Sequence, residues 1–235
     1  MKPEELQIIG EFKRLLNEEH KDNIVKEAVS LTTQTFPQKI IELHNIVNNE
    51  QFALSSMSKV RECPMIEKNQ IQINSYLAKC GEILGPVLTE MREHMITLKL
   101  WLTVLKAKHD NGDSLGAEVQ NELMNMVLDS EEFATSNYIF MLGLKAQPER
   151  CGMIANLRHK RRFPRIIPKI RLKQKPKIEH IVLETIRMYD ESSFIRLVET
   201  VEHTYYTYLR IHDYIEKNKD KITTPRQEHN PDFMM

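Results

Sequence analysis

The chain carries residue types that enzymes use, but not in the spacings that catalysis requires. Its nine histidines are scattered, and His203 and His212 are nine residues apart on the last predicted helix. We find no GxSxG, Walker, HExxH or GxGxxG motif. The three cysteines, at positions 63, 80 and 151, lack CxxC spacing, which argues against a disulfide framework and a thiolate metal site. We therefore predict a protein that is not an enzyme, with no catalytic residues, metal or cofactor.

The segment HDNGDSLG, residues 109–116, is the first stretch with a composition suited to contact another molecule. It holds two glycines and two aspartates, and Leu115 is its only large apolar side chain. In one interpretation it is only a connector, in which Gly112 ends one helix and Asp113 or Ser114 caps the next. In the other it is a binding loop, because polar loops held on rigid helices often carry binding residues.

A second candidate is the basic segment 158–177. It holds ten Lys and Arg and no acidic residue, so the remainder of this formally neutral chain carries a net charge of −10. Three interpretations remain open: a solvated loop, a nuclear localisation signal, and an electrostatic patch for nucleic acid or an acidic partner. Phe163 is its only aromatic residue, so base stacking is not supported. The residues proposed for nuclear localisation are Arg158, Lys160, Arg161, Arg162 and Arg165.

The elements that must position these segments are predicted to be long helices. Glycine is scarce at 7 residues, and apolar residues recur three and four apart, as on the buried face of a helix. The clearest heptad stripe is Leu84, Leu88, Met91, Met95, Leu98, Leu102 and Leu105. A second buried face consists of Phe194, Leu197, Val201, Tyr205, Tyr208, Ile211 and Ile215.

The pattern predicts a single all-α domain over residues 1–235, an antiparallel up-down-up-down four-helix bundle. We expect helices at about 4–48, 70–108, 115–146 and 178–222, with a bend at Pro37 and a kink or early turn at Pro86. A basic, proline-containing segment at 147–177 and a C-terminal tail at 225–235 complete the chain. In such a bundle the loop after helix two and the end of helix four lie at the same pole, and the basic segment lies at the opposite one.

The chain has no apolar run of 18 residues, so we predict no transmembrane helix. Its acidic N-terminal stretch has no small-residue cleavage site and predicts no signal peptide. The cysteine usage favours a reducing compartment, the cytosol or the nucleus.

Three segments, in the same order along the chain, resemble the 11S, or REG-type, proteasome activator family. TFPQKIIELHNIV (35–47) resembles the family's first helix with its mid-helix proline. WLTVLKAKHDNGDSLGAEVQ (101–120) resembles its tryptophan and activation loop, which has the pattern DGNNFGVxxQ. SFIRLVETVEHTYYTYLRIHDYIEKNKDKITTPR (193–226) resembles its last helix.

This resemblance implies a homo-oligomeric ring, expected to be a heptamer, which caps the 20S proteasome α-subunit ring without ATP and stimulates peptide hydrolysis. It implies that C-terminal tails dock the ring, here through Phe233, Met234 and the Met235 carboxylate, and that activation loops press on the gate. The loop residues would be Asp110, Asn111, Gly112, Asp113, Ser114, Leu115 and Gly116. Asp113 and Ser114 replace the family's asparagine pair, and a carboxylate cannot donate a hydrogen bond unless protonated.

Two departures from the family lie elsewhere in the chain. The insert between helices one and two is nearly absent, and the region from Gln120 to Pro176 is longer than in the family. The leading hypothesis is therefore a proteasome activator located in the nucleus, shared with the cytoplasm, with neither membrane nor nucleic acid as a partner. The alternative is a helical nucleic-acid or chromatin adaptor using residues 158–177, and a third hypothesis is a generic helical scaffold.

Overall fold

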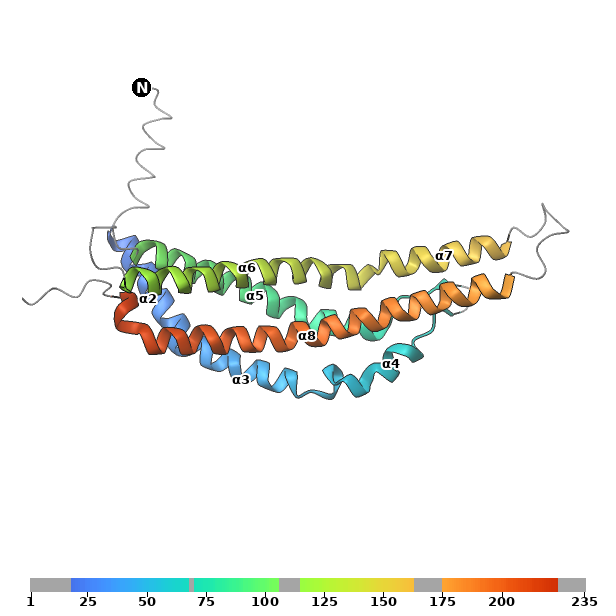
Figure 1. Cartoon of the computed structure of the whole chain (residues 1–235), viewed down its shortest axis with the longest axis horizontal. Helices are drawn as coiled ribbons and strands as arrows, with labels where there is room; N and C mark the ends of the chain where they lie inside the picture. Colours follow the sequence, from blue (N-terminus) through green and yellow to red (C-terminus); the bar gives the residue numbers. More distant parts are fainter. Residues whose placement is uncertain (1–17, 68–69, 106–114, 163–174, 224–235) are drawn as a thin grey trace, which may run out of the picture. The chain divides into compact units, whose positions relative to one another are not determined.

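The computed structural model describes residues 18–67, 70–105, 115–162 and 175–223. The first part consists of α2 (Glu18–Ser30), the π-helical turn η1 (Leu31–Thr35), α3 (Phe36–Val47), the 3-10 turns η2 (Glu50–Phe52) and η3 (Leu54–Ser56), and α4 (Met57–Glu62). Two short strands follow, β1 (Ile66–Glu67) and β2 (Gln70–Ile71). The remaining helices are α5 (Ser75–Leu105), α6 (Leu115–Ala146), α7 (Pro148–Arg162) and α8 (Lys175–Thr223) (Figure 1).

The described residues divide into two compact units, and α3, α5, α6 and α8 each contribute to both. Unit 1 contains the described residues up to Glu42, those of 90–134, and those from Tyr206 onward. Unit 2 contains those of 43–89 and 135–205.

The helices of unit 1 run antiparallel, as predicted. Phe36 of α3 contacts His94 of α5, and Lys39 contacts Glu90. Residue numbers therefore rise along α3 while those of its contacts on α5 fall, as in an antiparallel pair. The same order relates α5 to α6 through Lys99–Glu131 and Leu105–Gln120. It also relates α6 to α8 through Gln120–Ile222 and Glu122–Tyr214. Tyr208 packs edge-on against Phe36 with ring centroids 4.9 Å apart, which joins α8 to α3 and completes the four-helix bundle.

The predicted apolar stripes form the core. Every member of the α5 stripe from Leu84 to Leu102 is at most 2% exposed, and Leu105 at its end is half-buried. Of the α8 stripe, all but the half-buried Tyr205 are at most 3% exposed. Burying a large apolar side chain contributes roughly 1.5–3 kcal/mol, so these stripes are the main driving force for helix packing.

A partly buried group of polar side chains joins α3, α5 and α8 in unit 1. His94 Nδ1 and the Tyr208 hydroxyl lie 2.7 Å apart, and Lys39 forms ion pairs with Glu42 and Glu90. Burial lowers the pKa of His94, Lys39 adds to this effect, and Glu90 and Glu93 oppose it. His94 is therefore held toward its neutral form.

The chain widens to a π-helical turn just before Pro37, where the sequence predicts a bend. The Phe36 amide donates to Leu31 O, five residues back, and the Thr32 hydroxyl donates to Ala28 O over 3.0 Å. Proline has no N–H, and its ring clashes with the carbonyl four residues earlier in a regular helix. A local widening relieves this clash, which accounts for the position of η1.

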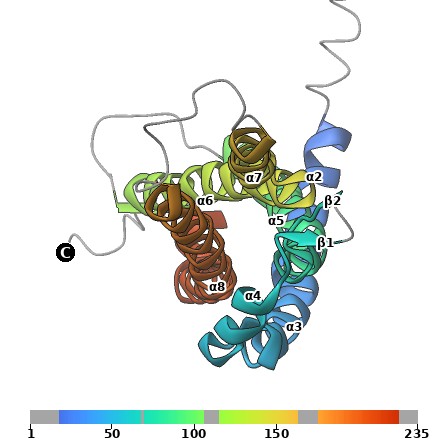
Figure 2. The ribbon, with the colours of Figure 1, turned by 90° about the vertical axis from the view of Figure 1, so that its right-hand side faces the viewer.

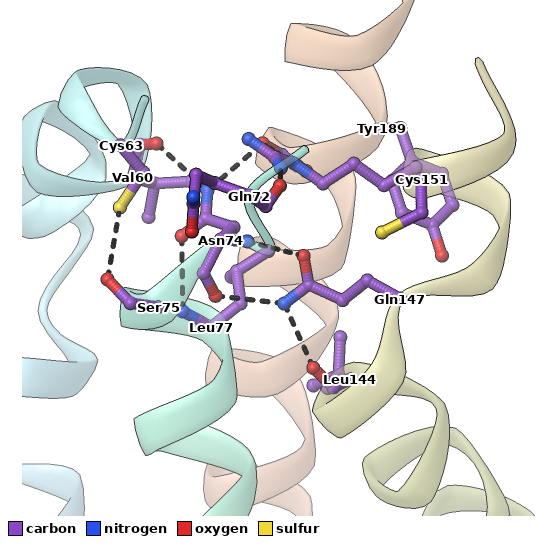
Figure 3. Close-up of polar contacts among 12 residues, drawn as sticks. Val60, Cys63, Gln72, Asn74, Ser75, Leu77, Leu144, Gln147, Cys151 and Tyr189 are labelled. Atoms are coloured by element: carbon purple, nitrogen blue, oxygen red, sulfur yellow. Dashed lines mark hydrogen bonds and ion pairs between the residues drawn. The ribbon is translucent and has the colours of Figure 1, made fainter. Parts of the chain in front are cut away.

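Unit 2 is held by a buried polar network around Asn74 and Gln147 (Figure 3). The Gln147 amide donates to Asn74 O and Leu144 O over 2.8 and 2.9 Å, and it accepts from Asn74 N over 2.6 Å. Asn74 also donates to Val60 O and to Asp190 Oδ2, each over 3.0 Å. These bonds connect α4, the start of α5, the junction of α6 with α7, and α8.

Arg150 completes this network from α7. Its Nε lies 3.0 and 2.9 Å from the two carboxylate oxygens of Asp190, and its Nη1 donates to Gln72 O. Arg150 is 0% exposed and Asp190 4% exposed, so the pair is removed from solvent. Beside it, Ile154 and Ile186 form a small apolar cluster with Met65, Ile71, Met153, Val182 and Leu183. The antiparallel β1–β2 hairpin, which supplies Ile71, precedes α5 (Figure 2).

Two predicted boundaries differ from the structure. The second long helix was expected from residue 70, but α5 begins at Ser75 because Asn74 acts as its N-cap, accepting from the Leu77 amide over 3.3 Å. The helix then continues through Pro86.

The basic, proline-containing segment 147–177 was expected to lie outside the long helices, yet Pro148–Arg162 forms a further helix, α7. Pro148 occupies the first helical position, where a missing N–H has no cost. Gln147, before it, has a left-handed φ of 46° and separates α6 from α7. This conformation costs of order 1 kcal/mol, which the Gln147 side-chain hydrogen bonds offset.

Candidate functional site

Most of the site residues inferred from the sequence fall outside the described ranges. Asp110, Asn111, Gly112, Asp113 and Ser114 of the loop, Phe233, Met234 and Met235 of the tail, and Arg165 all lie there. Leu115 begins α6 and Gly116 is buried in its first turn. Arg158, Lys160, Arg161 and Arg162 belong to the last turns of α7. The described part of the site is thus the set of helix ends that flank loop and tail.

One side chain connects these helix ends. Gln120, in the second turn of α6, donates from Nε2 to Leu105 O over 3.2 Å and to Ile222 O over 2.8 Å. Leu105 is the last residue of α5, and Ile222 is the last but one of α8. The residue before the loop, the helix after it and the residues before the tail therefore meet at one end of unit 1.

Tyr214 forms a second connection between α6 and α8. Its hydroxyl donates to Glu122 Oε2 over 2.8 Å, and Val119 O lies 3.3 Å away as a second acceptor. Burial, followed by the hydrogen bond to Glu122, raises the pKa of Tyr214 to about 12. The phenol is therefore a neutral donor at physiological pH.

The last turn of α8 is set apart from the rest of that helix. Asn218 has φ −119° and ψ 15°, outside the helical region, and its Nδ2 donates to Tyr214 O over 3.0 Å. Beyond this break, Ile222 is fully buried. The end of the helix is thus held by contacts of Ile222, while the regular helix geometry is interrupted at Asn218.

Apolar packing supports this end of unit 1. Trp101, Val119 and Leu123 are all at most 8% exposed, so the ends of α5 and α6 have buried side chains beneath them. Trp101 Nε1 is buried and has no hydrogen-bond partner among the described residues.

The sequence reasoning assigned no role to Gln120, Tyr214 or Asn218. A signal for Gln120 was present, because it lies one residue from Val119 and three from Leu123, where α6 turns an apolar face inward. A polar side chain at such a position needs a hydrogen-bond partner. The identity of that partner depends on tertiary structure.

The two histidines of the last helix differ in their exposure. His203 is exposed and His212 is half-buried. In the part of the chain that the structure describes, no three His, Cys, Asp or Glu side chains are grouped so as to hold a metal. None of the described helices is long and apolar enough to cross a membrane.

Comparisons with protein families match most of the chain. The family described as "Proteasome activator PA28, C-terminal" matches residues 70–232, and "Proteasome activator PA28, N-terminal" matches residues 17–64. A comparison with curated proteins found no match.

Solved structures show the same fold. The crystal structure of the 11S subunit of the Plasmodium falciparum proteasome, PA28, aligns with a TM-score of 0.70 at 19% identity, covering 96% of this chain and 98% of that one. A chain in the crystal structure of the 20S proteasome from yeast in complex with the proteasome activator PA26 from Trypanosoma brucei aligns with a TM-score of 0.51 at 14% identity. The alignment covers 91% of this chain and 89% of that one. A chain in the crystal structure of an archaeal 20S proteasome in complex with a mutated P26 activator aligns with a TM-score of 0.51 at 13% identity. The alignment covers 97% of this chain and 99% of that one.

Proposed function

Since this chain belongs to the proteasome activator PA28 family, we propose that it docks on the 20S proteasome through its C-terminal tail and opens the gate with the loop between α5 and α6. A member of this family is a regulatory protein rather than a catalyst. The solved relatives in complex with a 20S proteasome, from yeast and from an archaeon, support the choice of partner.

The observation that carries this proposal is the meeting of helix ends at Gln120. Its amide joins Leu105, which precedes the loop, to Ile222, which precedes the tail. A partner that binds the tail is therefore presented with the loop as well. A short tail binds weakly by itself, but several tails on one assembly bind together through avidity.

The test is a peptidase assay with purified 20S proteasome and a fluorogenic peptide. Adding the protein is expected to raise cleavage, and deletion of Phe233–Met235 is expected to abolish that gain by preventing binding. Asp113→Tyr should retain binding, measured by co-sedimentation with the 20S particle, but lose stimulation. If binding and stimulation fall together in Asp113→Tyr, the division of roles between tail and loop is wrong.

We further propose that copies of the chain form a closed ring, a heptamer, through two exposed apolar faces. On α8, Ile181, Met188 and Ile195 are 62, 65 and 42% exposed and recur every seventh residue, on a different side of the helix from the buried Phe194 and Val201. Two helical turns separate them, so they form one line.

The second face lies on α6, where Ile139 and Leu142 are 64 and 45% exposed. A chain that has two different apolar faces is suited to head-to-tail contact with its own copies, and such contacts close into rings. The face on α8 of one copy would then pack against the face on α6 of the next.

Mixing variants tests this assembly. Met188→Glu and Leu142→Glu are each expected to give monomers by analytical ultracentrifugation, because a charge in either face prevents every contact. A mixture of the two retains one intact pair of faces and should give dimers. The neighbouring exposed Arg187→Ala is the control and should leave the ring intact. Dimers formed by Met188→Glu alone would show that the faces do not pair head to tail.

A nuclear location, shared with the cytoplasm, is proposed from the charge of residues 158–177. Replacing Arg161 and Arg162 by alanine in a fluorescent fusion should shift the protein from the nucleus to the cytoplasm. An unchanged distribution would contradict the proposal, and salt-sensitive binding of DNA by the purified protein would favour the adaptor hypothesis.

A further inference from the structure

Gln120 is a buried polar side chain whose two amide hydrogens face two different helix ends. It is 4% exposed, and its Nε2 lies 3.2 Å from Leu105 O and 2.8 Å from Ile222 O. An amide nitrogen has two donor hydrogens, so it can serve both carbonyls at once.

Both acceptors are backbone carbonyls at the C-terminal ends of α5 and α8, as far as the structure describes these helices. Leu105 and Ile222 are among the last four described residues of their helices, the part of an α-helix where carbonyls take donors from outside the helix. The C-terminal end of a helix also carries a partial negative charge, which favours a hydrogen-bond donor and disfavours a carboxylate. The chemistry of Gln120 therefore fits a shared cap on two helices.

We propose that Gln120 is a positioning residue for proteasome activation. It couples the end of α8, which precedes the tail, to the end of α5, which precedes the loop. This role rests on the function proposed above. The contact with Ile222 holds the helix end from which the tail leaves, and the contact with Leu105 holds the helix end from which the loop leaves. Displacement of one helix end on docking is thereby opposed by the other, so binding at the tail is transmitted to the loop.

The chain provides a matched control in the other unit. Gln147 is also a buried amide, 1% exposed, and its Nε2 donates to two backbone carbonyls, Asn74 O and Leu144 O, over 2.8 and 2.9 Å. Both contacts lie within unit 2. Loss of this amide removes two buried hydrogen bonds to backbone carbonyls, as loss of Gln120 does, although Asn74 O keeps the Ala78 amide as a donor over 3.1 Å. It does not involve the ends that flank loop and tail.

The experiment compares Gln120→Met, Gln120→Glu and Gln147→Met as full-length proteins. Each is titrated against 20S proteasome, and the dissociation constant and the maximal peptidase stimulation at saturation are measured separately. For Gln120→Met, the dissociation constant should change by less than about twofold, while maximal stimulation falls by at least about fivefold, the factor typical of losing one hydrogen bond's worth of free energy. Gln120→Glu should lose more, because a carboxylate also lacks a hydrogen to donate and in addition places a negative charge against the two carbonyl oxygens.

Gln147→Met should lower the thermal midpoint but leave maximal stimulation at the wild-type level. If Gln120→Met is insoluble, Gln120→Asn keeps the amide but is one methylene shorter, and should show the same separation of binding from stimulation. Wild-type stimulation in a soluble Gln120 variant would overturn the role of Gln120 alone. An equal loss of stimulation in Gln147→Met would overturn it too, since the effect would then be general destabilisation. Absence of stimulation by the wild-type protein would instead overturn the proposed function, and the role of Gln120 with it.

Discussion

Replacement of Arg150 by methionine should destabilise unit 2 by an amount that depends on the charge state of its partner. Arg150 is 0% exposed and its Nε lies 3.0 and 2.9 Å from the two carboxylate oxygens of Asp190. Methionine fills much of the same volume but leaves the Asp190 carboxylate buried. The side-chain amide of Asn74, whose Nδ2 lies 3.0 Å from Asp190 Oδ2, then remains as a donor. Removing one member of a buried ion pair typically costs about 3–5 kcal/mol, and we expect a loss in this range.

The origin of this loss is tested by removing the second charge. In Arg150→Met with Asp190→Asn, no uncompensated charge remains, so at least about half of the lost free energy of unfolding should return. The exposed Arg187, 3.7 Å from Glu184, is the control, and Arg187→Met should change the free energy by less than about 1 kcal/mol.

The assay is urea denaturation at one fixed protein concentration, because the stability of an oligomer depends on concentration. Hydrogen exchange of the Asn74 backbone N–H reports on the network locally, since this N–H donates to Gln147 Oε1 over 2.6 Å. Two results would refute the reasoning. One is a loss below about 1 kcal/mol in Arg150→Met, and the other is a further loss on adding Asp190→Asn.

Two further predictions concern titratable groups. Because burial lowers the pKa of His94 below its ordinary 6.5, the unfolded chain binds a proton more readily, and stability should fall as the pH drops below 6.5. The thermal midpoint, measured at neutral pH and at about pH 5, should fall less in His94→Gln than in the wild-type protein. An equal fall in both proteins would exclude His94 as a source of the pH dependence. Burial raises the pKa of Cys80 to about 11, so a thiol reagent at mildly alkaline pH should modify Cys63 and Cys151, which are half-buried, before Cys80. Mass spectrometry of the modified peptides measures the order, and early modification of Cys80 would contradict its burial.

The long helices could be predicted because their signal is repeated many times. The stripe from Leu84 to Leu102 repeats the same apolar spacing in each heptad, so a single exception such as Pro86 does not hide the helical pattern. The antiparallel order followed from the four-helix bundle that the helical pattern predicted. The meeting of the α5, α6 and α8 ends was therefore expected before the contacts of Gln120 were known.

Features set by a single residue could not be predicted in the same way. The start of α5 depends on the side chain of Asn74, which resembles any other polar residue in the sequence. Helix α7 was missed because the prolines of 147–177 suggested a break throughout, whereas Pro148 begins a helix. The left-handed backbone of Gln147 is compensated by contacts with Asn74 and Leu144, and Asn74 is distant in sequence.

The residues of loop and tail were assigned through resemblance to a family, and their contacts remain a prediction. The helix ends that flank them are described, and Gln120 was found there because a structure shows which carbonyls its amide reaches. Periodicity indicates that a position is buried. It does not indicate which distant backbone group a buried amide will meet.

The interruption at Asn218 has a consequence for how this protein could diversify. Because the helical geometry is broken there, the final turn of α8 can change its direction through substitutions at a few local positions, without disturbing the long packed rod that precedes it. The anchor point of a tethered ligand determines how far that ligand reaches and at what effective concentration it meets its receptor. Substitutions in this one turn are therefore a simple route by which members of the family could shift the point at which the tail begins.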